Sequence, residues 1–95
     1  MSKSIMQAEK ECYITSRTDN LHKHHIYFGT GNRKISEQNG FWIWLTGELH
    51  NQDSRKDIHS DREFDLAIKM FCQKIYERTH TREEFMALIG RNYLD

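Results

Sequence analysis

The most apolar stretch of the chain, FWIWL at 41–45, is only five residues long. A short apolar run between turn residues is typical of a buried strand, and here Asn-Gly precedes it and Thr-Gly follows it. A second segment, LHKHHIYF at 21–28, is rich in aromatic and β-branched side chains and also suits a strand. The glycines at 29 and 31 mark a loop between the two, so we expect two strands that pair as a hairpin.

The second half of the chain carries helix signals. Residues 60–63 and 81–84 each fit a capping box, with Ser or Thr followed three residues later by Glu. Between them, apolar side chains recur at helical spacing and predict a helix from about 61 to 78. A shorter helix follows, and Gly90 is a good stop for it. The expected buried stripe of the longer helix consists of Phe64, Ile68, Phe71 and Ile75.

This order of strands and helices is that of a small α+β protein. With 95 residues, 37% of them apolar, the chain has room for one small core, so we expect a single domain. We divide it into a polar N-terminal arm at 1–11 (a short helix or a loose arm), a hairpin region at 12–59 and C-terminal helices at 60–95. No apolar run approaches the roughly 20 residues that span a bilayer, so no membrane partner is expected.

Charge and cysteine content limit the class of protein further. Lysine and arginine total 14, as do aspartate and glutamate, so the formal net charge is zero. A strongly basic coat for non-specific nucleic-acid binding is therefore excluded. Two cysteines cannot build a disulfide framework and no secretory signal is visible, so we expect a reduced, cytoplasmic protein. Cys72 is expected in the core and Cys12 to be an ordinary small residue.

Six histidines are the compositional outlier, and five of them fall between His22 and His59. On a strand, His22 and His24 point to one face and His25 to the other. Two histidines on one face could share a metal ion or a phosphate, and the opposite one is then available for proton transfer. His50 and His59 could return to the same place. The structural alternative for each is a partly buried ring with one hydrogen-bonded nitrogen.

Three segments, LHKHHIYFGTGNRKIS at 21–36, GFWIWLTGELHN at 40–51 and DIHSD at 57–61, carry a resemblance. Together they look like the small phage-encoded nucleases of the HNH (ββα-metal) class, and EEFMALIGRNYL at 83–94 resembles the tail of these phage proteins. The resemblance covers most of the chain. It implies a ββα-metal hairpin followed by C-terminal helices, and hydrolysis of DNA phosphodiesters with one divalent ion, Mg²⁺ or Mn²⁺.

The resemblance also implies roles by position. The class places a metal-binding residue just before a general-base histidine in the first strand, which matches His24 and His25. A later histidine, the second metal ligand, matches His50, and His59 is an additional candidate as ligand or phosphate contact. The base removes a proton from water, and the metal stabilises the charge on the phosphate. Three cations could hold backbone phosphates, unless they are simply a solvated face: Lys23, Arg33 and Lys34.

The chain departs from the class at its zinc knuckle. Many members carry CxxC before the first strand and CxxC or CxxH after the second. Here the two stretches read CYIT at 12–15 and TGEL at 46–49, so Cys12 alone remains. A zinc site needs four thiolate or imidazole donors, so we expect no structural zinc. Core packing or a homodimer would then supply the missing stability.

The middle asparagine of the HNH pattern is a second departure, because that position holds Phe41. Asn39 and Asn51 lie nearby, and either could replace it. The aromatic run itself has two readings, stacking on bases or core packing, and core packing is the commoner one. As strand residues, Trp42 and Trp44 would face the same side.

Two main functions stay open. The first is a phage-type HNH endonuclease that acts on DNA, which the retained histidines favour. The second is a zinc-less, catalytically impaired scaffold that binds and inhibits a host defence nuclease, in the manner of an anti-CRISPR protein, which the zero net charge favours. A structural partner in a phage recombination or packaging complex is a third. All three place the protein in the host bacterial cytoplasm.

Overall fold

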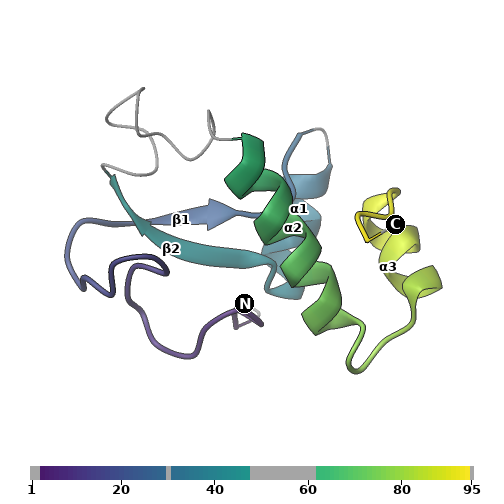
Figure 1. Ribbon diagram of the computed structural model, residues 1–95, viewed down its shortest axis with the longest axis horizontal. Coiled ribbons are helices and arrows are strands. Elements are labelled where there is room, and N and C mark those ends of the chain that lie inside the picture. Colours follow the sequence, from purple (N-terminus) through teal and green to yellow (C-terminus); the bar gives the residue numbers. More distant parts are fainter. Residues whose placement is uncertain (1–2, 30, 48–61, 95) are drawn as a thin grey trace.

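A computed structural model describes residues 3–29, 31–47 and 62–94 of the chain (Figure 1). The described elements follow in the order β1 (Leu21–His25), α1 (Asn32–Asn39), β2 (Trp42–Thr46), α2 (Arg62–Tyr76) and α3 (Arg82–Ile89). The small α+β class and the strand pair are therefore confirmed. No helix in these ranges is both long and apolar enough to cross a membrane.

The two strands pair antiparallel, with His22 opposite Leu45 and His24 opposite Ile43. β1 ends at His25, three residues earlier than predicted, and β2 is shifted by one residue from the predicted 41–45. Ile26 still donates its amide hydrogen to the Phe41 carbonyl at 2.9 Å. After β1 the side chains of Ile26 and Tyr27 are both buried in the core.

The segment between the strands contains helix α1, where the sequence indicated only a loop. Its C-terminal residue is followed by Gly40 in the left-handed conformation (φ 76°), whose amide donates to the Ser36 carbonyl. The buried Ser36 hydroxyl accepts from the Tyr27 amide at 3.2 Å and donates to the Tyr27 carbonyl at 2.7 Å. These two bonds fix α1 against the end of β1.

Helix α2 runs within the predicted 61–78, but its buried face is rotated from the predicted stripe. Phe71 is 45% exposed, whereas Cys72 and Gln73 are completely buried. The capping box predicted at 60–63 lies partly outside the described residues. Cys72 is a core residue as predicted, and burial raises the pKa of its thiol to about 12.

The core is an aromatic cluster between the strands and the helices. The ring of Tyr27 packs edge-on against Phe41 and Phe85, with centroids 5.5 and 5.4 Å apart. Phe41 in turn packs against Tyr76 at 5.4 Å. The buried apolar cluster comprises Cys12, Ile26, Tyr27, Phe41, Ile43, Leu45, Ile68, Cys72, Tyr76, Phe85 and Ile89.

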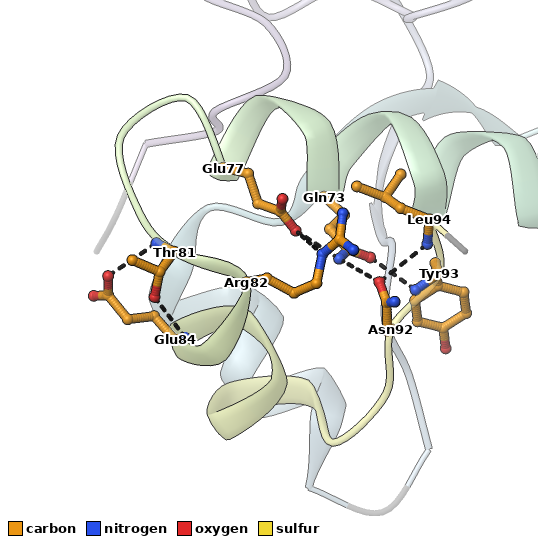
Figure 2. A network of polar contacts seen from close by, with 8 residues as sticks. All are labelled: Gln73, Glu77, Thr81, Arg82, Glu84, Asn92, Tyr93 and Leu94. Carbon is orange, nitrogen blue, oxygen red and sulfur yellow. Dashed lines mark hydrogen bonds and ion pairs between the residues drawn. The ribbon is translucent and has the colours of Figure 1, made fainter.

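The C-terminal part is tied to α2 by a polar network, which Figure 2 shows. Gln73 donates to Glu77 at 2.7 Å and to Asn92 at 2.8 Å, and its Oε1 accepts from the Tyr93 amide at 2.8 Å. The capping box predicted at 81–84 is present, with Thr81 Oγ1 accepting from the Glu84 amide at 3.1 Å. Helix α3 ends before Gly90, as predicted.

The described part of the N-terminal arm is neither a helix nor loose. It runs along the edge of β2 that faces away from β1 (Figure 1). The Ile5 amide donates to Gly40 at 2.9 Å, and the Ser4 hydroxyl donates to the Trp42 carbonyl at 2.6 Å. The Trp44 amide donates to Gln7 Oε1 at 2.7 Å. These contacts satisfy the outer edge of β2.

Candidate functional site

Strand β1 sends its histidines to opposite faces. The His24 side chain enters the core side and is completely buried. The side chains of Lys23 and His25 point to the other face, where both reach the carboxylate of Glu37. Because strand side chains alternate, two adjacent histidines cannot share a face. The structure therefore separates the predicted metal ligand from the predicted base.

His25 is held by a carboxylate from α1. Its Nε2 lies 3.1 Å from Oε1 of Glu37, and its side chain is 13% exposed. A carboxylate only accepts hydrogen bonds, so Nε2 carries the proton in this pair. In the neutral ring, Nδ1 then has the free lone pair and can accept a proton. Such an arrangement can orient an imidazole for proton transfer.

Glu37 also holds Lys23, whose Nζ lies 3.0 Å from Oε2 and 3.3 Å from Oε1. The hydrogen bond from His25, followed by that from Lys23, lowers the pKa of the Glu37 carboxyl below its ordinary value of 4.5. The carboxylate is therefore ionised at neutral pH. Lys23 is engaged by this ion pair rather than being a solvated cation.

An open pocket of about 440 Å³ adjoins this pair. It is lined by His25, Gly31, Arg33, Lys34 and Glu37. The sequence-predicted base and two of the three predicted phosphate contacts thus line one cavity, with Lys23 beside it on Glu37. A histidine with two cations around a pocket can bind a phosphate and accept a proton next to it.

The implied metal centre is not completed by the described residues. His50 and His59 lie outside them, and no three His, Cys, Asp or Glu side chains within the described ranges lie together as a metal site. Magnesium prefers oxygen ligands and keeps several waters. The completely buried His24 imidazole, on the opposite face from His25, offers neither an oxygen ligand nor room for metal-bound water. The described residues therefore do not fit a metal shared with His25.

The segment that the resemblance matches to a zinc knuckle is a hydrogen-bonded turn. Cys12 is buried, and its Sγ accepts a hydrogen bond from the Thr15 amide at 3.5 Å. Ser16 follows in the left-handed conformation, with φ 64°. Burial opposes ionisation of the Cys12 thiol, but hydrogen bonds from Thr15 and from the neighbouring backbone amides together lower its pKa. Position 49 lies outside the described residues.

Sequence reasoning missed Glu37, which contacts His25 where the resemblance implies an asparagine. Asn39 donates its side-chain amide to the Ile35 carbonyl at 2.9 Å, within its own helix, and does not reach His25. Asn51 lies outside the described residues. Glu37 was overlooked because its segment is polar and was interpreted as a loop. Arg33 and Glu37 are four residues apart, so a helix over this segment places them on one face. That spacing is the sequence signal that could have identified Glu37 as a neighbour of the predicted site.

The tryptophans share one face, as predicted, and it is the face of His25. Trp42 lies opposite His25 in the strand register, and Trp44 lies opposite Lys23. Lys23 Nζ lies 4.2 Å from the ring centroid of Trp42 and 5.8 Å from that of Trp44. Lys10 Nζ lies 4.7 Å from the centroid of Trp44. Among the three aromatic residues of the run, Phe41 enters the core cluster, together with Ile43 and Leu45.

Comparison of the chain with protein-family models, curated proteins and solved structures found no match. The assignment of function therefore rests on the geometry of the site and on the resemblance of its motifs.

Proposed function

We propose that the protein is a phage-type HNH-like endonuclease that hydrolyses DNA phosphodiesters, with His25 as its general base. The observation that supports this best is the His25–Glu37 hydrogen bond of 3.1 Å at the wall of a pocket lined by Arg33 and Lys34. An oriented imidazole and two cations are the groups that water activation and phosphate binding need. The zero net charge is compatible with a local site of this kind.

In this proposal each residue has one task. Glu37 keeps the proton on Nε2 of His25, and Nδ1 takes a proton from the attacking water. Arg33 and Lys34 bind the phosphate and oppose the charge that builds on it. A positioned base of this kind contributes roughly 10²- to 10⁴-fold to a rate. Lys23 acts through Glu37, whose orientation it fixes.

The divalent ion enters the proposal through the resemblance alone. Mg²⁺ or Mn²⁺ would be held by His24 with His50, and His59 is a further candidate ligand. Because the described residues do not fit this ion, no step of the proposed reaction depends on it.

The test is nicking of supercoiled plasmid with Mg²⁺, with Mn²⁺ and with EDTA. Wild type should nick, and His25→Ala should not. His80→Ala is the matched control, because His80 is an exposed histidine stacked on Tyr76, with ring centroids 4.1 Å apart, and does not line the pocket. Nicking by His25→Ala at the wild-type rate would refute the assignment of the base.

The burial of His24 favours a second function. If its imidazole is a core group rather than a ligand, the scaffold lacks a metal centre and acts as a binding protein. Its proposed partner is then a host defence nuclease, in the host bacterial cytoplasm. Purified protein would inhibit such a nuclease stoichiometrically, His25→Ala would inhibit equally well, and neither would nick plasmid.

A further inference from the structure

The face of the hairpin that carries His25 is an aromatic surface with cations over it. Lys23 and His25 from β1 lie opposite Trp44 and Trp42 from β2, so the four side chains form one continuous patch. Lys10, from the N-terminal arm, extends this patch, because its Nζ lies over the Trp44 ring. Lysines within 6 Å of a tryptophan centroid interact with the face of the ring.

The two rings differ in their accessibility. Trp42 is 5% exposed and forms the floor beneath Lys23, whereas Trp44 is half-buried. The backbone of Trp44 is fixed on its outer side, since its amide donates to Gln7 at 2.7 Å and its carbonyl accepts from the Tyr13 amide at 2.8 Å. Trp44 is thus a partly exposed ring on a strand that is held on both edges, with Lys10 and Lys23 close to it.

We propose that Trp44 stacks on an unpaired base, so that the DNA bound at this site is single-stranded or locally unwound. This inference rests on the proposed function and names its substrate class. Every base has a π-face, whereas the bases of an intact duplex are already stacked on one another. Lys10, an exposed side chain over the Trp44 ring, would move aside for the base and meet a phosphate next to it. The strand would then continue across the patch towards His25.

The experiment measures binding without cleavage, by the anisotropy of a labelled oligonucleotide of about 12 nucleotides, single-stranded or in a duplex, in EDTA. Wild type should bind the single strand more tightly than the duplex. Trp44→Leu should weaken single-strand binding by about 5- to 100-fold. Phe71→Leu is the matched control, because it removes an exposed aromatic ring from α2.

Lys10→Ala provides a variant that leaves the core intact, because Lys10 is exposed. It should reduce the slope of log affinity against log salt by about 0.7, the value for one phosphate contact on a single strand. Equal wild-type affinity for single strand and duplex would overturn the inference. So would a Trp44→Leu variant that binds like Phe71→Leu, or a Lys10→Ala variant with the wild-type slope.

His25→Ala separates this inference from the proposed function. It should bind the single strand with wild-type affinity although it does not nick. Single-strand binding that depends on Trp44, together with no nicking by wild type, would support the interface and reject the nuclease. Nicking that depends on His25, together with unchanged binding by Trp44→Leu, would support the nuclease and reject the interface.

Discussion

Nε2 of His25 lies 3.1 Å from Oε1 of Glu37, and this pair joins strand β1 to helix α1. His25 is the last residue of β1, and Glu37 lies on α1 in the connection between the strands. Packing of α1 onto β1, through the Ser36 hydroxyl, is what brings them together. The orientation of the proposed base therefore depends on a helix inserted between the two strands.

Removing the charge of Glu37 should slow the reaction. Glu37→Gln keeps the shape of the side chain but fixes the proton on Nε2 of His25 less strongly. We expect the plasmid-nicking rate to fall between about 10-fold and 100-fold, with circular dichroism unchanged. Glu9→Gln, which changes an exposed carboxylate in the N-terminal arm, should nick at the wild-type rate. A full-rate Glu37→Gln enzyme would show that the pair is structural only.

The same pair should make stability depend on pH. The folded-state pKa of Glu37 lies below its ordinary value of 4.5, mainly because His25 and then Lys23 bond to the ionised form. Its contribution is therefore fully present above pH 4.5 and is lost as the pH falls through the folded-state pKa. Urea unfolding of wild type and Glu37→Gln should give free energies that differ above pH 4.5 and converge below it. A difference that grows on acidification would contradict this assignment.

Gly40 and Gly90 form a matched pair of helix C-caps. Both are left-handed, with φ values of 76° and 83°. A Cβ at Gly90 would meet nothing within 4 Å, whereas one at Gly40 would collide with the Lys3 carbonyl. Gly90→Ala should cost about 1 kcal/mol of unfolding free energy, and Gly40→Ala clearly more. Hydrogen exchange at the Ile5 amide should accelerate only in Gly40→Ala, because that variant displaces the arm.

Gln73 should be important for docking of the C-terminal segment. Its buried amide bonds to Glu77, Asn92 and the Tyr93 backbone (Figure 2). Gln73→Ala leaves these partners unsatisfied, so we expect a loss of about 1–3 kcal/mol in urea unfolding. Lys74→Ala, at an exposed neighbouring position on α2, should change the free energy by less than about 0.5 kcal/mol. An equal effect of the two substitutions would argue against the network.

Zinc should not affect folding. Cys12 is the one cysteine at the four positions that the resemblance matches to a zinc knuckle, and its Sγ already accepts a hydrogen bond from the Thr15 amide. We expect elemental analysis of the purified protein to find no stoichiometric zinc, and added zinc to leave the thermal midpoint unchanged. A midpoint that rises with one equivalent of zinc would mean that other side chains complete a site.

Local patterns predicted most of the regular structure. The strands, the Thr81 capping box and the stop at Gly90 all depend on residues near one another in the sequence, and all are present. Helix α1 was missed because NRKISEQN has one strongly apolar residue, Ile35, and so has no apolar stripe to reveal its period. Its helical state comes from the packing of Ser36 on Tyr27, which depends on the tertiary fold.

The site was predicted in part for the same reason. His25, Arg33 and Lys34, which sequence reasoning proposed as a base and phosphate contacts, line one pocket, and those roles stay predictions. Glu37 was not foreseen, because its contact with His25 requires α1. The exposure of Phe71 was not foreseen either. The apolar residues of α2 allow more than one buried face, and packing against the rest of the fold determines that Cys72 and Gln73 are buried.

The arm along the outer edge of β2 has a consequence for assembly. It uses side chains of Ser4 and Gln7 as well as backbone, so the edge is closed without a regular third strand. An uncovered edge is a template on which another chain can add a strand. A variant that lacks residues 1–11 keeps the core residue Cys12 but loses the contacts of Ser4, Ile5 and Gln7 with this edge. It should therefore form higher-order species through β2, and its failure in solution would be aggregation rather than simple unfolding.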